Sequence, residues 1–350
     1  MLAELTLSDW ARMRDEVARR ECEELAGRLP YDLQLTGLAD HSYCGHTHRV
    51  ARFSLKEKGG YAQFVLVPGG EVRLGFDVEE FRPSPSQLKS YERSARQYKL
   101  NDSIERFVDS QTSAPRTVYL QPVLVEADAR PVERRDDIQE LDCDDPKFQE
   151  YERIFPGDGK WEPWSGNPNE CHHVVERKGG VLRVWRRPSV TMQHLEARLA
   201  AQRVRLPTCD EWEHVCGAGT RTLFRWGNIN PSDFYPTDTC AEDRMLKTAW
   251  ALSFGRLQYE TPSAEWDLHL QSNLFGLGIA GDPYRPDLVS DGPLALGGDG
   301  GCRICGGMGF FLGWLPLATA FRDPWGMKIR PEVTNVADDY HRLRRVIPLA

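Results

Sequence analysis

Short apolar runs interrupted by glycine and proline dominate the chain from residue 49 onward, and they restrict its fold more than any other feature. Runs such as HRVARFSL (48–55), YAQFVLVPGGEVRLGFD (61–77) and RTVYLQPVLVEA (116–127) have the length and composition of strands. The polar segment 81–115 and the acidic segment 126–170 predict long loops with short helices. Many short elements joined by loops indicate an α+β fold with an irregular surface.

Two segments have the residue spacing of helices. The first, residues 8–27, has Ser8 as a candidate N-cap, Gly27 as a stop, and one apolar face (Trp10, Met13, Val17 and Leu25). The second lies within residues 189–207 and ends before Pro207. We therefore expect an N-terminal helical extension over residues 1–50, followed by one domain over residues 50–350.

Composition argues against several classes of protein. A net charge of −8 without a dense block of lysine and arginine argues against nucleic acid as a partner. The N-terminus lacks the pattern of a signal peptide, and no apolar run reaches the roughly 18 residues that span a membrane, so we expect no membrane partner. Nine cysteines form an odd set in a chain large enough to fold without disulfides. These features predict a cytoplasmic protein with reduced thiols.

The most specific motif is RLPTCDEWEHVCGAGTRTLFRWGN, residues 205–228. It resembles the signature of the formylglycine-generating enzyme, or sulfatase-modifying factor, family, whose pattern is R-L-P-T-E-A-E-W-E followed by a glycine-rich stretch and W-G-N. The matching residues are Arg205, Leu206, Pro207, Thr208, Glu211, Trp212, Glu213, Trp226, Gly227 and Asn228. Thr208 with Glu211 three positions later is also a capping box. We interpret the signature as a determinant of the fold rather than of the chemistry.

The order of the surrounding segments resembles that family over roughly residues 50–332. Residues 64–77 resemble its opening strand pair, residues 116–132 its second pair, and residues 188–202 the helix before the signature. The resemblance implies the C-type-lectin-like variant fold, which is rich in loops. It also implies copper as a cofactor and calcium as a structural ion.

The segment LALGGDGGCRICGGMGF, residues 294–310, contains the candidate catalytic and metal-binding thiols. Family members that oxidise a substrate cysteine hold one copper ion between two cysteines spaced C-x4-C, and soft thiolates suit Cu(I). By the resemblance, Cys302 takes the first position, whereas Gly307 takes the second. Cys305 instead forms C-x-x-C, a spacing that allows a soft-metal site or a redox disulfide. A glycine-rich turn without chemistry is the alternative.

Other departures from the family surround this segment. Asp299 replaces the family's serine, and the apolar sequence GGMGFFLGWLPLATAF (306–321) replaces an arginine-rich stretch. The second change predicts an apolar ligand surface that includes Trp314. Trp161 and Trp164, in a Pro- and Gly-rich loop, predict a platform on which a ligand could stack, although loop closure over the core explains them equally well. Asp299, Trp314 and these two tryptophans are the candidate ligand-binding residues.

A histidine-rich segment, HSYCGHTH (41–48), offers a second kind of metal site. His41, His46 and His48 are candidate ligands for iron, copper or zinc. A branch of the family resembling ergothioneine-type sulfoxide synthases holds non-haem iron with three histidines of an added helical bundle. An extension of about 50 residues is too short for a four-helix bundle, so a solvated loop is the alternative.

Three functions follow as hypotheses. The first is a divergent metal-dependent oxidase, containing copper, that acts on a peptide, protein or small-molecule thiol through Cys302 and Cys305. The second is a non-catalytic, lectin-like module that binds a protein or a small ligand. The third is an iron-dependent enzyme that forms C–S bonds and requires His41, His46 and His48 to converge.

Overall fold

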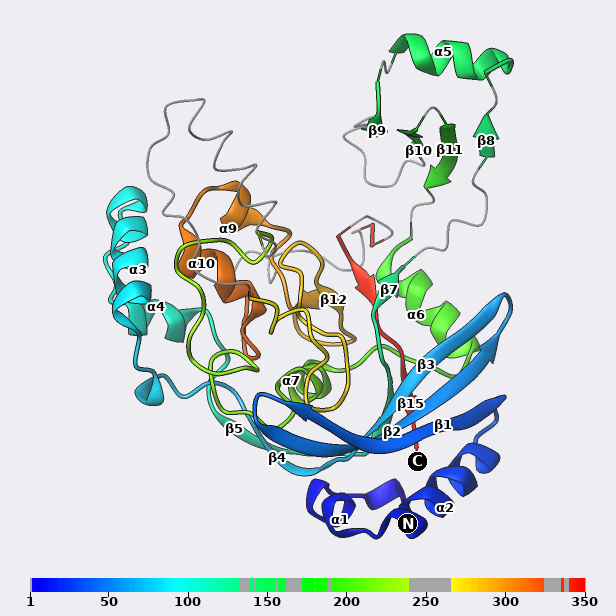
Figure 1. Ribbon diagram of the computed structural model, residues 1–350, viewed down its shortest axis with the longest axis vertical. Coiled ribbons are helices and arrows are strands. Elements are labelled where there is room, and N and C mark those ends of the chain that lie inside the picture. Colours follow the sequence, from blue (N-terminus) through cyan, green and yellow to red (C-terminus); the bar gives the residue numbers. More distant parts are fainter. Residues whose placement is uncertain are drawn as a thin grey trace.

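Figure 1 shows the computed structural model, in which helices and mostly antiparallel sheets are packed around several hydrophobic clusters. This mixture places the chain in the α+β class. The structure describes residues 2–132, 139–141, 143–154, 157–161, 172–179, 181–187, 190–238, 266–323, 335–336 and 340–349. No helix within these ranges is both long enough and apolar enough to cross a membrane.

A five-stranded antiparallel sheet forms the centre of the domain. Its strands, in spatial order, are β1 (Leu33–Tyr43), β2 (His46–Glu57), β3 (Gly60–Val67), β6 (Val123–Glu126) and β15 (Val346–Pro348). Side chains alternate between the two faces of a strand. In β3, Phe64 and Leu66 accordingly belong to one buried cluster and Val65 and Val67 to another. The sheet is therefore buried on both faces, as the continuous apolar run in its sequence indicates.

The N-terminal segment covers one of these faces. It contains η1 (Leu2–Glu4), α1 (Leu7–Arg12) and α2 (Asp15–Arg28), which Figure 1 shows beneath the β1–β2 hairpin. Trp10 is fully buried and donates from its indole nitrogen to the carbonyl of Arg49 at 2.7 Å. The expected single helix is interrupted, because Met13 and Arg14 have extended backbone angles. Residues 33–50, expected within the helical extension, are instead strands of the central sheet, and residue 50 lies inside β2.

The signature helix α7 (Cys209–Gly217) covers the opposite face. Beyond it lies an aromatic cluster built mainly from short helices. These are η2 (Val78–Glu80), α3 (Pro85–Tyr98), α4 (Ile104–Ser110), α10 (Phe310–Trp314) and η3 (Leu315–Leu317). The one-turn helix α9 (Cys302–Cys305) contacts α10. The expectation of short helices within residues 81–115 is confirmed for α3 and α4.

A small sheet with its own hydrophobic cluster projects from the domain at the upper right of Figure 1. It consists of β8 (Gln139–Leu141), β11 (Val181–Arg187), β10 (His172–Lys178) and β9 (Gly159–Trp161), in that order, with α5 (Pro146–Ile154) nearby. Phe148 of α5 packs with Val175 and Leu182 of the sheet. The acidic segment 126–170, predicted as long loops with short helices, thus contributes the helix α5 and two strands, β8 and β9, to this unit; the strands were not predicted.

The remaining strands form two smaller sheets. One pairs β4 (Gly70–Leu74) with β5 (Arg116–Leu120), and the other has the order β13 (Ala295–Leu296), β12 (Asp287–Leu288), β14 (Arg342–Leu343), β7 (Arg130–Pro131). Residues 64–77 therefore contain two strands that pair with different partners, because β3 joins β6 and β4 joins β5. The helix expected before the signature is α6 (Met192–Ala201).

Candidate functional site

The start of α7 has the local structure that its sequence predicts. The Thr208 hydroxyl accepts a hydrogen bond from the amide of Glu211 at 3.1 Å, and the Glu211 carboxylate accepts one from the amide of Thr208 at 2.9 Å. Arg205 donates to both oxygens of the same carboxylate, at 2.6 and 2.7 Å. Trp212 is fully buried, and its indole nitrogen donates to Asp287 at 3.1 Å. This end of the helix is occupied by structural contacts.

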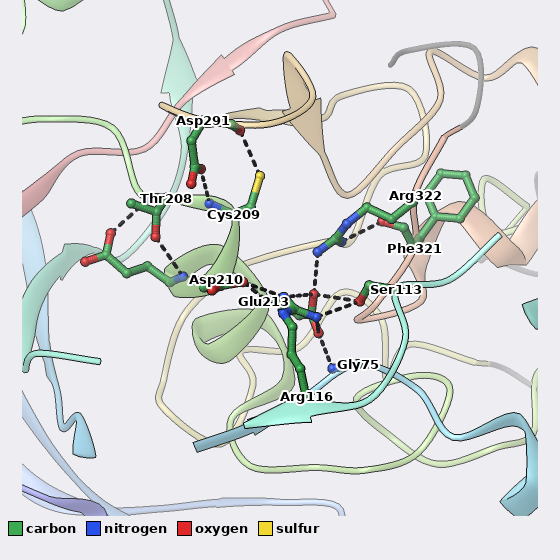
Figure 2. Close-up of polar contacts among 11 residues, drawn as sticks. Gly75, Ser113, Arg116, Thr208, Cys209, Asp210, Glu213, Asp291, Phe321 and Arg322 are labelled. Carbon is green, nitrogen blue, oxygen red and sulfur yellow. Dashed lines mark hydrogen bonds and ion pairs between the residues drawn. The ribbon is translucent and has the colours of Figure 1, made fainter. Parts of the chain in front are cut away.

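Glu213 lies at the centre of the most extensive charge network around α7 (Figure 2). Only 3% of it is exposed, and two guanidinium groups, those of Arg116 and Arg322, donate to its carboxylate. Ser113 and the amide of Gly75 also donate to it. The carboxylate therefore joins α7 to three other segments, which contain Gly75, Ser113 with Arg116, and Arg322. With so many donors on it, Glu213 has a structural role and is not a free general base.

The first cysteine of α7 is also held by structural contacts. The Cys209 thiol donates to the backbone carbonyl of Asp291 at 2.8 Å, and its amide donates to the Asp291 carboxylate, as Figure 2 shows. Burial raises the pKa of this thiol to about 12. Cys209 is therefore protonated at neutral pH and is unreactive.

The two predicted catalytic thiols, Cys302 and Cys305, are at the two ends of the one-turn helix α9. Both are free and exposed, and the hydroxyl of Tyr284 lies 3.2 Å from the sulfur of Cys305. Gly301, which precedes the helix with φ of 78°, allows this approach because a Cβ there would overlap the Tyr284 ring. The structure thus places both thiols on one helical turn at the surface, with a hydroxyl beside that of Cys305.

The predicted ligand-binding residue Asp299 has a structural contact in this conformation. It is buried and forms an ion pair with Arg303 of α9 at 2.9 Å, and Arg303 also donates to Gln111 at 2.6 Å. Burial raises the pKa of the Asp299 carboxyl, while the Arg303 charge opposes the rise. Burial also raises the pKa of Cys302, and the nearby negative charges of Asp299 and Asp323 act in the same direction. Cys302 is therefore a thiol at neutral pH unless a ligand displaces its proton.

Trp314 does not form the expected ligand surface. It is fully buried, its indole nitrogen donates to the carbonyl of Phe234 at 2.9 Å, and its ring contacts Trp226 and Trp266 edge to face. The apolar sequence around it fills the aromatic cluster because α10 packs inward against α3. Trp161 ends β9, but its side chain lies outside the described part of the chain, as does all of Trp164.

The three candidate histidines lie at the free end of the β1–β2 hairpin. His41 pairs in register with His48, and His46 follows the turn formed by Cys44 and Gly45. The ring of His48 packs 5.1 Å from that of Phe275, and burial lowers its pKa to about 4. His41 lies 3.4 Å from the carbonyl of Ser272. Across the ranges that the structure describes, no three His, Cys, Asp or Glu side chains are grouped as a metal site would require. Within those ranges, His41, His46 and His48 do not form such a group.

A cavity of about 210 Å³ lies beside the hairpin turn and was not predicted from the sequence. Its lining comes from three segments: the hairpin turn, the loops that follow α7, and residues 273–274. A signal available in the sequence is Gly219 after α7, whose φ of 86° lies in the region that favours glycine and lets the chain turn beside the cavity. Arg225 and Trp226, inside the signature segment, also line it.

The chain matches no protein-family model, and no curated protein matches it at a significant level.

Proposed function

We propose that this chain is a divergent formylglycine-generating-enzyme-like oxidoreductase in which Cys302 and Cys305 hold one copper ion and act on a thiol of a peptide, a protein or a small molecule. The observation that carries the proposal is the pair of free, exposed thiols on the single turn of α9. Thiolates are the protein ligands that favour Cu(I), so the donor chemistry fits this ion. The C-type-lectin-like fold of the resemblance belongs to the same proposal.

The residues around the pair have separate roles in this scheme. Exposure of both thiols lets a substrate thiol approach from solvent. The Tyr284 hydroxyl would donate a hydrogen bond to a Cys305 thiolate and stabilise that charge. The buried Asp299–Arg303 pair fixes the turn that carries both cysteines. Bound copper would supply the activation of dioxygen, which accepts the electrons that leave the substrate thiol.

The test is the metal content of purified protein after loading with Cu(I). We expect one copper per chain in the wild type and none in Cys302→Ala. Cys143→Ala is the matched control, because Cys143 is also exposed and free but lies outside α9. Copper that persists in Cys302→Ala, or that is lost equally in Cys143→Ala, would contradict the assignment. A screen of peptide thiols for oxygen uptake then identifies the substrate class.

A second candidate function is a binding module on the same scaffold. The cavity beside the β1–β2 turn favours it, because an aromatic ring and a cation line this hollow. A chain that retains no copper but binds a small ligand in this cavity would support the binding function over the oxidoreductase.

A further inference from the structure

The cavity beside the β1–β2 turn has an unusual charge composition. Arg225 and His46 line it, and none of the described residues that line it is Asp or Glu, although the whole chain has a net charge of −8. Among the described residues the wall is therefore cationic or neutral, which favours a negatively charged occupant.

Arg225 lacks a counter-ion among the described residues. Only 5% of it is exposed, and its terminal nitrogens donate to the backbone carbonyls of Ala280, at 2.8 Å, and His269. Its Nε atom is buried and has no hydrogen-bond partner within the described ranges. Burying a charge is unfavourable unless it is paired, so an anion in the cavity would compensate this cation.

The positive charge of Arg225 acts on the Cys44 thiol in the hairpin turn. Burial raises the pKa of the Cys44 thiol, whereas a hydrogen bond from Tyr43 and the charge of Arg225 oppose that rise. An anion placed among these groups would therefore feel the guanidinium charge at short range, where the protein screens it less than bulk water does.

The aromatic wall favours an organic anion. Trp226 stacks on Phe224 with parallel rings whose centroids are 4.8 Å apart, and its indole nitrogen donates to the carbonyl of Ile229. The polar edge of the indole is thus satisfied, the guanidinium of Arg225 lies over the ring at 5.3 Å from its centroid, and the part of the ring that lines the cavity is apolar. The volume lies below the roughly 300–1,000 Å³ typical of sites for drug-sized molecules, which limits the ligand to a small one.

We propose that this cavity binds a small organic carboxylate, with the carboxylate beside Arg225 and His46 and the apolar part against Trp226. One guanidinium and one imidazole suit a single carboxylate better than a phosphate dianion, which is held by several converging donors. The inference rests on the binding function proposed above. It is separate from the copper chemistry, because none of the described residues that line the cavity belongs to α9.

The experiment titrates the full chain with benzoate and follows binding by calorimetry. Benzamide, which has the same shape without the charge, is the control ligand. We expect saturable benzoate binding, a loss of about tenfold or more in affinity in Arg225→Lys, and a loss of about threefold in His46→Gln. His46→Gln keeps the test valid if Arg225→Lys fails to fold, because His46 is exposed. His194→Gln, which removes an exposed histidine from α6, should bind benzoate like the wild type.

Four results would overturn the inference: no binding of benzoate, equal binding of benzamide, unchanged affinity in both cavity variants, or stronger competition by inorganic phosphate. Copper content measured on the same preparations separates the two proposals. Arg225→Lys should load copper like the wild type, so failure of benzoate binding with copper retained would reject the cavity ligand and leave the oxidoreductase standing.

Discussion

Helices α7 and α9 lie in the two segments on which the sequence-based prediction of an enzyme family depended, yet their side chains are used in different ways. On α7, the charged groups of Glu211 and Glu213 are buried and accept hydrogen bonds from several arginines. On α9, the two thiols are exposed, and a single hydroxyl contact is described for Cys305. The residues of the α7 motif are therefore occupied by structural contacts, whereas the exposed thiols available for chemistry lie on α9.

The largest expected effect comes from breaking the network on α7. Glu213→Ala leaves two partly buried guanidinium groups without their shared carboxylate, so we expect the free energy of unfolding to fall by about 3–5 kcal/mol. Urea denaturation of the wild type and of Glu213→Ala measures this change in the free energy of unfolding. Glu24→Ala is the matched control, because the Arg20–Glu24 pair on α2 is exposed and its loss should cost less than about 0.5 kcal/mol. Similar losses in both variants would mean that Glu213 is not a structural centre.

The second-largest effect is expected from acid, which should lower the stability of the fold around α7. Burial lowers the pKa of His48 to about 4 and also lowers the pKa of His214, and both rings pack against Phe275. A histidine with a lower pKa in the folded state stabilises the fold fully above its unfolded pKa of about 6.5, and this stability is lost as the pH falls toward 4. We expect protonation of His48 to lower the free energy of unfolding by about 3 kcal/mol over that interval, and protonation of His214 to act in the same direction. His48→Gln should flatten the measured pH profile, and an unchanged slope would contradict the assignment.

A smaller effect is expected at the N-terminus of α7. Thr208→Ala removes the hydroxyl that accepts from the Glu211 amide, which should lower the free energy of unfolding by about 1 kcal/mol. Thr208→Ser keeps the oxygen and should restore most of the stability. Denaturation of both variants tests the capping box. Equal stability of the alanine and serine variants would show that the cap contributes nothing measurable.

The smallest effect on stability is expected at α9. Cys302→Ser and Cys305→Ser change exposed side chains, so the free energy of unfolding should stay within about 0.5 kcal/mol of the wild type. Cys216→Ser is the matched contrast, since this thiol is fully buried on α7 and a buried hydroxyl without a partner costs about 1–3 kcal/mol. Destabilisation of the α9 variants as large as that of Cys216→Ser would remove the difference between the two helices.

Local patterns predicted the elements that depend on neighbouring residues. Thr208 and Glu211 form their capping box, and the leucines of α6 are buried, because both features arise within one or two helical turns. Burial of Trp314 was not predicted, since it depends on the docking of α10 against α3 from a distant part of the chain. The same holds for the cavity, whose walls come from three separated segments. The pairing of Arg116 and Arg322 with Glu213 likewise needed the tertiary fold.

The most direct measurement is alkylation of thiols in the native protein, mapped by peptide mass spectrometry with and without Cu(I). Without copper, we expect the exposed Cys302, Cys305, Cys44 and Cys143 to react, and the buried Cys22 and Cys216 to be protected. One equivalent of Cu(I) should protect Cys302 and Cys305 together and leave Cys44 and Cys143 reactive. Full alkylation of the α9 pair in the presence of bound copper would contradict the division of roles between the two helices.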